Sequence, residues 1–297
     1  MTPLRFDGQA ALVTGAGGGL GKQYALDLAR RGARVMVNDI GMKDGHYTAA
    51  AVAAEIRNEG FQAFHDISDV GTEHGAQAMV DATVAAFGDI NLLVNNAGMN
   101  VNGVVHEAST ADFLAEINVH LMGALWTMRA AIPRMRAQNY GRIVNTSSAL
   151  GAFAGVKSAP YITAKAAIMG LSKSAALDNE DRDIRINALA PLAVTPLAAG
   201  YLAIKPETLG QLNMAKLGVN LVSPAVLYLL HRSCTLNGEM LAAGGGRVAR
   251  IFAATGPGYI PDELTAEGIA ENLERIMDTM GFIIPRTSAE QYSLLPK

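Results

Sequence analysis

The sequence contains a single cysteine, Cys234, among its 297 residues. One cysteine excludes an intrachain disulfide and a cysteine-rich metal site, and it fits a reducing compartment. The 6 histidines show no paired spacing of a metal motif such as His-Glu-x-x-His, so we interpret all of them as surface or packed residues. No metal is therefore predicted.

Charge is also scarce and nearly balanced. Only 17% of the residues are charged, the formal net charge is −3, and the lysines and arginines are scattered along the chain. This distribution lacks the basic footprint that a nucleic-acid backbone requires, so nucleic acid is not an expected partner. Half of the residues are hydrophobic, which is enough to bury a large core and excludes a disordered chain.

Long hydrophobic runs are absent as well. No stretch reaches the 18 apolar residues that a membrane span needs, and residues 1–8 contain no apolar segment of the secretory kind. The final residues, Leu295 to Lys297, differ from the Ser-Lys-Leu peroxisomal signal. We expect no membrane span and a cytoplasmic location.

Short runs rich in valine, isoleucine and leucine alternate with amphipathic stretches of helical length. This alternation predicts an α/β protein, a single Rossmann-like domain over residues 5–250 with a doubly wound parallel sheet and helices on both faces. Residues 251–297 are predicted to form a helical extension that packs on the domain or on a partner subunit. About seven strands are expected, at residues 10–14, 34–39, 61–66, 91–95, 141–147, 184–190 and 239–243.

Several helix boundaries can be read from individual residues. Pro133 is expected to end or kink the helix that begins near residue 110. The segment 196–216 interrupts the alternation and is a candidate lid, and residues 265–280 are expected to form a helix in the tail. Three helix starts carry capping signals, which are Thr72, Ser109 with Asp112, and Ser223 with Pro224.

A glycine-rich turn, Thr14 to Gly21, follows the first predicted strand directly and precedes a helix that opens near Leu20. Glycines there let the backbone turn sharply and approach a pyrophosphate at the helix N-terminus. Asp39 ends the second strand 18 residues after Gly21, close to the spacing at which a carboxylate reaches the adenosine ribose. This carboxylate favours NAD and would repel the 2′-phosphate of NADP, although Lys43 is a nearby cation. Asp39 would otherwise be a strand-end turn residue.

A second group of polar residues follows the strand predicted at 141–147. Ser148 comes at its end, and Tyr161 and Lys165 stand four apart, so they share one face of the next helix. A free phenol has a pKa of about 10, and a neighbouring ammonium with an oxidised nicotinamide would lower it enough for acid/base catalysis. The alternative is an amphipathic helix with a lysine that extends to solvent.

Together these motifs resemble the short-chain dehydrogenase/reductase family over roughly residues 5–250. The resemblance rests on Thr14 to Gly21, Asn95 to Gly98, Asn118, Ser148, Tyr161, Lys165 and the segment from Arg185 to Thr195. It implies NAD as cofactor and a catalytic set of Asn118, Ser148, Tyr161 and Lys165. Implied cofactor contacts are Gly15, Gly19, Leu20, Gly21, Asp39, Asp66, Ile67, Asn95, Ala97, Gly98, Tyr161, Lys165, Pro191, Val194 and Thr195.

The same resemblance implies individual roles. Asp66 would contact the adenine and Asn95 the adenosine half of the cofactor. Lys165 would also bind the nicotinamide ribose, and Thr195 would touch the carboxamide. Asn118 would hold a water molecule in a proton relay. One departure is Leu192, which follows Pro191 where the family commonly has glycine.

A narrower resemblance is to the dehydrogenase part of peroxisomal multifunctional enzymes and their bacterial relatives. It rests on residues 5–8, 37–41, 140–144 and 264–267. It implies a bulky apolar substrate, a (3R)-3-hydroxyacyl-CoA or a hydroxysteroid, and a homo-oligomer, either dimer or tetramer. Two alternatives stay open, which are another small hydrophobic alcohol or ketone and an NAD-binding regulatory protein without catalysis. The residues do not distinguish oxidation from reduction.

Overall fold

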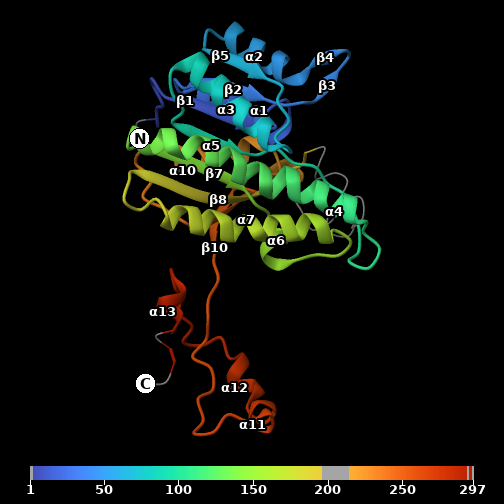
Figure 1. Cartoon of the computed structure of the whole chain (residues 1–297), viewed down its shortest axis with the longest axis vertical. Helices are drawn as coiled ribbons and strands as arrows, with labels where there is room; N and C mark the ends of the chain where they lie inside the picture. Colours follow the sequence, from blue (N-terminus) through green and yellow to red (C-terminus); the bar gives the residue numbers. More distant parts are fainter. Residues whose placement is uncertain (1–2, 196–213, 293, 296–297) are drawn as a thin grey trace. The chain divides into compact units, whose positions relative to one another are not determined.

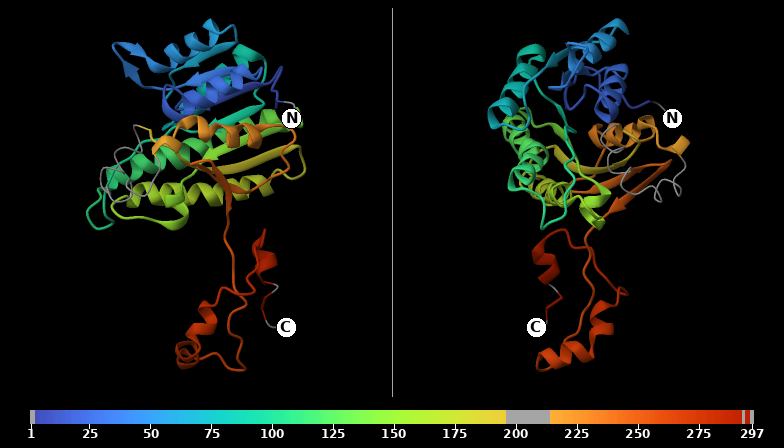
Figure 2. Two further views of the ribbon diagram at one scale, coloured as in Figure 1. Left: turned by 180° about the vertical axis from the view of Figure 1, so that it is seen from behind. Right: turned by 90° about the vertical axis from the view of Figure 1, so that its right-hand side faces the viewer.

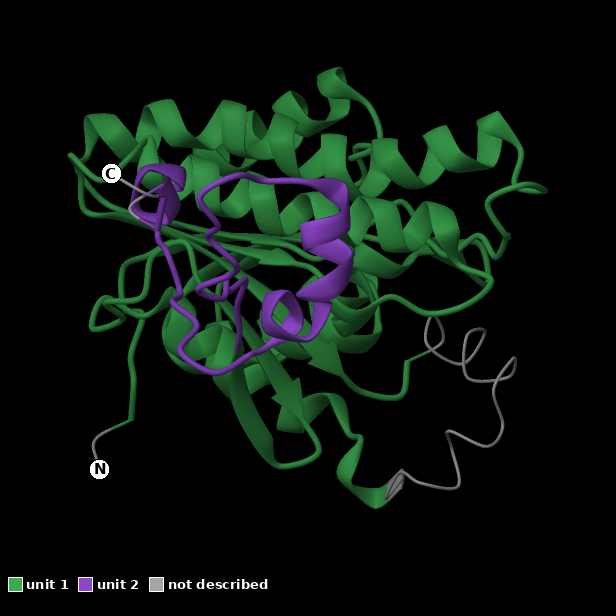
Figure 3. Cartoon of the chain, turned by 90° about the horizontal axis from the view of Figure 1, so that it is seen from below, with its two compact units in different colours: residues 1–250 green, residues 251–297 purple. Residues whose placement is uncertain are grey.

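A computed structural model describes residues 3–195, 214–292 and 294–295 of the chain (Figure 1). The chain divides into two compact units, Met1–Arg250 and Ile251–Lys297 (Figure 3). The candidate lid at 196–216 lies almost entirely outside the described residues. None of the helices in the described part has the length and hydropathy that a bilayer crossing requires.

An eight-stranded sheet organises the first unit. Its strand order is β10-β9-β8-β7-β6-β1-β2-β5, and all seven predicted strands are present, so the expected Rossmann-like α/β fold is confirmed. The eighth strand, β10, follows a glycine turn after β9 and was not predicted. The strands are β1 Ala10–Thr14, β2 Arg34–Asn38, β5 Ala63–Asp66, β6 Leu92–Asn95, β7 Gly141–Thr146, β8 Ile184–Leu192, β9 Met240–Gly244 and β10 Arg247–Ile251.

The direction in which successive strands are added to the sheet reverses beside β1. β1 pairs in parallel with β2 on one side and with β6 on the other. The chain therefore builds β2 and β5 outward in one direction and β6, β7, β8 and β9 in the opposite direction. In open parallel sheets a crevice forms at such a switch point, outside the carboxyl ends of the strands, and this is where ligands bind.

Helices cover both faces of the sheet (Figure 2). Successive residues of a strand point to opposite faces, and in β1 Val13 packs with one hydrophobic cluster while Leu12 packs with the other. The first cluster includes residues of α1 Gly19–Arg30, α2 Thr48–Asn58 and α10 Ser223–Leu230. The second includes residues of α3 Glu73–Phe87, α5 Gly123–Ala137 and α7 Ala159–Leu177.

Two of the three predicted helix caps are confirmed. Gly75 N donates to Thr72 Oγ1 at 3.0 Å, and Asp112 N donates to Ser109 Oγ at 3.0 Å, at the start of α4 Thr110–Glu116. The third is wrong, because Ser223 is itself the first residue of α10 and its hydroxyl donates to Asp27 Oδ2 at 2.6 Å.

Pro133 was expected to end or kink the helix; it does not end it, since α5 continues through Pro133 to Ala137. The irregularity lies earlier, in a π-helical segment, η1 Ile117–Met122, that joins α4 to α5. Smaller elements of the first unit are the hairpin strands β3 Met42–Lys43 and β4 His46–Tyr47, α6 Ala149–Phe153, and the 3-10 turns η2 Met214–Lys216 and η3 Val219–Leu221.

The second unit contains three short helices. These are α11 Ala266–Glu271, α12 Leu273–Met277 and α13 Ser288–Tyr292. The helix predicted over 265–280 is divided at Asn272, whose backbone leaves the helical region (φ −111°, ψ 22°). An antiparallel bridge between Thr255 and Ile283 joins the two ends of the segment 255–283, which includes α11 and α12.

Candidate active site

The glycine turn between β1 and α1 packs tightly against the loop that follows β6. Gly15 (φ +62°) and Gly19 (φ +51°) occupy the left-handed region that favours glycine. A Cβ atom on Gly15 would lie 2.6 Å from Ala97 Cα, and one on Gly21 would lie 2.3 Å from Gly15 O. Only hydrogen fits at these two positions, so the backbone itself forms the surface at the end of β1.

The two loops are also joined by hydrogen bonds. Asn96 Nδ2 donates to the carbonyl oxygens of Thr14 and Gly15, both at 3.1 Å. The hydroxyl of Thr14 accepts from the backbone N–H groups of Asn96 at 3.0 Å and Ala97 at 3.1 Å. The predicted contacts Gly15, Ala97 and Gly98 are thereby brought to one place, at the switch point of the sheet.

Two carboxylates lie at the adjacent strand ends. Asp39 accepts hydrogen bonds from Gly17 N at 2.9 Å and from Gly41 N at 2.7 Å, so it lies directly beside the glycine turn. Asp66 accepts from Asn38 Nδ2 at 2.7 Å and from Ser68 N at 2.9 Å. Both predicted acids are therefore at the carboxyl edge of the sheet, with Ile67 exposed next to Asp66.

The Asn95 side chain is directed into the core. Its oxygen accepts from the Thr127 hydroxyl at 2.7 Å, and its amide donates to Asn145 Oδ1 at 2.9 Å. Both ends of the amide are used, so the predicted adenosine contact of Asn95 is left to its backbone. On the other side of the turn, a Cβ atom on Gly19 would lie 3.6 Å from Thr195 Cγ2. Thr195 follows the predicted contacts Pro191 and Val194 in the chain.

Ser148, Tyr161 and Lys165 meet beyond the end of β7. Ser148 caps α6 by accepting from Leu150 N at 3.1 Å, and its side chain also lowers the pKa of the Tyr161 phenol. Lys165 is almost fully buried, with Nζ 5.7 Å from the centre of the Tyr161 ring and bonded to Thr146 O at 2.5 Å. The structure therefore assembles three of the four predicted catalytic residues.

Burial dominates the acid/base properties of this pair. It raises the pKa of Tyr161 above its ordinary value; the Ser148 hydrogen bond opposes this and the Glu116 charge adds to it. Burial also lowers the pKa of Lys165 to about 7, against the influence of Glu116. The expected acidic phenol therefore does not arise from the protein alone, because the lysine that should stabilise the phenolate is itself desolvated.

The fourth predicted residue, Asn118, is exposed on the π-helical segment η1. Among the described residues, His120 contacts Tyr161 instead, with the two rings edge to face at a centroid distance of 5.4 Å. His120 Nε2 lies 2.9 Å from Glu116 Oε2, and both side chains are fully buried. Sequence reasoning missed this pair, although a glutamate and a histidine four residues apart on a helix are a detectable signal.

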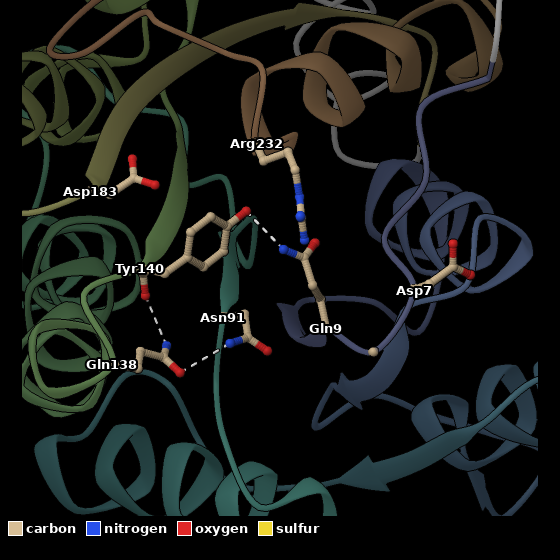
Figure 4. Close-up of a pocket in the computed structure, with 8 residues that line it drawn as sticks. Asp7, Gln9, Asn91, Gln138, Tyr140, Asp183 and Arg232 are labelled. Atoms are coloured by element: carbon tan, nitrogen blue, oxygen red, sulfur yellow. Dashed lines mark hydrogen bonds between the residues drawn. The ribbon is translucent and has the colours of Figure 1, made fainter.

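A separate cavity of about 610 Å³ lies at the opposite edge of the sheet, where the strands begin (Figure 4). Its polar side chains bond to one another, since Gln9 Nε2 donates to the Tyr140 hydroxyl at 2.8 Å and Asn91 Nδ2 to Gln138 Oε1 at 3.1 Å. None of the predicted site residues lines it. The predicted site residues therefore lie at the carboxyl ends of the strands, away from this cavity.

Known proteins share the fold of this chain. The short chain dehydrogenase family matches residues 9–202. The chain is 36% identical to the peroxisomal multifunctional enzyme type 2 of Mus musculus over 97% of its length, but it spans only 39% of that enzyme. It is 39% identical to a short-chain type dehydrogenase/reductase of Mycobacterium tuberculosis, covering 81% of this chain and 83% of the relative. A short chain dehydrogenase structure from Mycobacterium avium superimposes with a TM-score of 0.79 at 29% identity, covering 91% of this chain and 95% of the other.

Proposed function

Because this chain belongs to the short-chain dehydrogenase family of oxidoreductases, we propose that it transfers a hydride between NAD(H) and a secondary alcohol or ketone, with Tyr161 as the acid/base. The observation that carries the proposal is the pairing of half-buried Tyr161 with buried Lys165, whose Nζ lies 5.7 Å from the centre of the phenol ring, near Ser148 at the carboxyl end of β7. A phenol and an amine four residues apart on α7 supply a proton donor and a charge that stabilises its conjugate base.

The residues at the carboxyl edge fit a dinucleotide. The turn from Gly15 to Gly21 is glycine apart from Ala16 and Leu20, and a Cβ on Gly18 would meet no atom within 4 Å. A pyrophosphate bound there would lie at the N-terminus of α1. Asp39 stands beside the turn, where a carboxylate would bind the ribose hydroxyls and would disfavour a 2′-phosphate.

The proposed step follows from these positions. NAD, when bound, supplies the acceptor for the hydride that leaves the alcohol carbon. Ser148 holds the substrate oxygen by a hydrogen bond, and Tyr161 removes the hydroxyl proton. Lys165 provides the positive charge that favours the phenolate, and the charge of the oxidised nicotinamide acts in the same direction.

We propose a bulky apolar hydroxy compound as substrate, such as a 3-hydroxyacyl-CoA or a hydroxysteroid. Support comes from large apolar side chains exposed at the ends of the elements that carry the site, Phe153 (73% exposed) on α6 and Leu192 (45%) on β8. The similarity to a peroxisomal multifunctional enzyme supports the same choice. The cytoplasmic location, the homo-oligomer and the packing of residues 251–297 stay predictions.

The experiment is an assay of NADH formation by the purified chain against hydroxyacyl-CoA thioesters, hydroxysteroids and simple secondary alcohols. The proposal expects turnover with at least one bulky class and little with the simple alcohols. Tight NAD binding with no turnover across all three classes would instead support the alternative of an NAD-binding regulatory protein.

Replacing Asp39 with asparagine is expected to relax the choice of cofactor. The amide keeps one oxygen for a backbone N–H but removes the charge that repels a 2′-phosphate. We expect the ratio of kcat/KM for NAD to that for NADP to fall roughly ten- to hundredfold, about 1.4–2.8 kcal/mol. Asp44→Asn, in the exposed turn between β3 and β4, is the control. An unchanged ratio in Asp39→Asn would show that this carboxylate does not select the cofactor.

A further inference from the structure

Glu116 and His120 form a buried pair directly behind the Tyr161–Lys165 couple. Glu116 ends α4 and His120 lies on η1, with His120 Nε2 2.9 Å from Glu116 Oε2 and no exposure of either side chain. The imidazole meets the Tyr161 ring edge to face. A carboxylate is costly to bury unless something holds it there, so this placement requires an explanation beyond packing.

The pair fixes the loop that follows β6. Val101 N donates to Glu116 Oε1 at 2.5 Å, and His120 Nε2 lies 2.8 Å from Met99 O and 3.2 Å from Met99 N. A Cβ on Gly98 would lie 2.5 Å from His120 Cε1, so the loop approaches the imidazole closely. The side chains of Glu116 and His120 thus contact this loop at Gly98, Met99 and Val101.

The same loop is joined to the start of the catalytic helix. Gly103 N donates to Lys157 O at 3.0 Å, and Ala159 N donates to Gly103 O at 3.0 Å. Ala159 is the first residue of α7, which carries Tyr161. A displacement of the Glu116–His120 pair would therefore reach the phenol by two routes, through ring contact and through this loop.

The surroundings of His120 disfavour a charged imidazole. Burial and the Lys165 charge lower the pKa of His120, which favours a neutral imidazole, and its Nδ1 has no hydrogen-bond partner among the described residues. The Glu116 charge raises the pKa of both Tyr161 and Lys165. Among the described residues, the titratable groups acting on one another here are Glu116 from α4, His120 from η1, and Tyr161 and Lys165 from α7, with the neutral Ser148 beside them.

We propose that Glu116 and His120 are positioning residues for the Tyr161–Lys165 couple: Glu116 anchors the loop after β6 through Val101 N and places a buried carboxyl group against His120, and His120 holds the phenol ring and the same loop in place. The proposal rests on the proposed function of the couple. The contact of His120 with Tyr161 is separate from the role that the resemblance implies for Asn118, which is to hold a water molecule in a proton relay.

The first test is the pH profile of kcat/KM in Glu116→Gln. Loss of the negative charge should move both limbs of the profile to lower pH, by roughly half to one pH unit for one buried charge, because both groups of the couple then release protons more readily. Glu107→Gln, at a glutamate whose side chain is 74% exposed, is the matched control and should leave the profile in place. If the Glu116→Gln enzyme is folded and both limbs of its pH profile stay where they are in wild type, the influence of Glu116 on Tyr161 and Lys165 is refuted.

The second test compares His120→Ala with His120→Gln. The glutamine amide reaches the position of Nε2 and retains a donor and an acceptor for the Met99 backbone, whereas alanine retains neither. We expect kcat to fall roughly ten- to hundredfold in His120→Ala with little change in KM, and His120→Gln to recover much of it. His106→Ala, at an exposed histidine, is the control. Equal kcat in wild type and His120→Ala, with both folded by circular dichroism, overturns the positioning role.

A readout without turnover separates this proposal from the proposed function. The ultraviolet absorbance of tyrosinate, taken as the difference between a protein and its Tyr161→Phe counterpart, follows ionisation of Tyr161 alone. The Glu116→Gln background should shift this titration to lower pH even if no substrate is turned over. If the wild type turns over no substrate but the titration shifts in Glu116→Gln, the proposed function is refuted and the influence of Glu116 on Tyr161 stands. If the wild type turns over substrate but the titration does not shift, the influence of Glu116 on Tyr161 is refuted.

Discussion

Replacing Tyr161 with phenylalanine is expected to reduce kcat for alcohol oxidation by about 10³-fold or more. The substitution removes the hydroxyl that exchanges the substrate proton but keeps the ring that packs against His120. Cofactor affinity should change little, because the glycine turn and Asp39 lie on other elements. The measurement is NADH formation under saturating substrate, with cofactor binding followed separately by fluorescence quenching.

A matched control is Tyr228→Phe on α10, where the side chain is 39% exposed and belongs to no part of the site. This variant should keep wild-type turnover. Wild-type kcat in Tyr161→Phe would remove Tyr161 from the reaction. A loss of cofactor binding equal to the loss of kcat would assign it a binding role instead.

Lys165→Met is expected to lower kcat/KM by about 10²-fold or more near neutral pH. Methionine fills a similar volume in the buried position but cannot carry charge, so the phenolate loses its partner. Because the variant loses the positive charge that favours the phenolate, the pKa of Tyr161 should rise and the rising limb of the pH profile should move to higher pH. Steady-state rates across a pH series measure both effects.

The control for this substitution is Lys173→Met, two turns further along the same helix and only partly buried. It should preserve the profile. A Lys165→Met enzyme whose rising limb stays in place, with a reduced rate, would mean that the lysine orients the cofactor or the substrate and has no influence on the phenol.

The two groups share protons, and their apparent pKa values belong to the couple. Burial lowers the pKa of Lys165 to about 7 and raises that of Tyr161, so between these values the couple has lost one proton. That proton is missing either from the Lys165 ammonium or from the Tyr161 phenol. Only the form with the Tyr161 phenolate contains the catalytic base. The positive charge of an oxidised nicotinamide would favour the phenolate form, which would make the base available when NAD is bound.

Much of the fold could be predicted because its signals are local. Buried parallel strands appear as short apolar runs, and all seven predicted runs became strands. β10 was missed because arginines interrupt its short apolar sequence and three of its five residues are exposed, as in an edge strand that needs no apolar face. The turn at Gly15 and Gly21 was predictable because only glycine tolerates the contacts found there.

The position next to Tyr161 could not be predicted, for a physical reason. A π-helical turn contains an extra residue, so it rotates the side chains that follow relative to a regular α-helix. Gly123 N bonds to Asn118 O across such a turn, which leaves Asn118 exposed and brings His120 to the tyrosine. Single-residue insertions of this kind depend on tertiary packing, which the sequence pattern does not reveal.

The most direct test of the central claim is a titration of Tyr161 itself, by tyrosinate absorbance in wild type minus Tyr161→Phe. It is performed on the free protein, with NAD and with NADH. Our account predicts that NAD moves ionisation to lower pH by about one unit or more, whereas NADH, which lacks the charge on the nicotinamide ring, leaves it near that of the free protein. Identical titrations in all three states would contradict the role of the couple as a cofactor-dependent base.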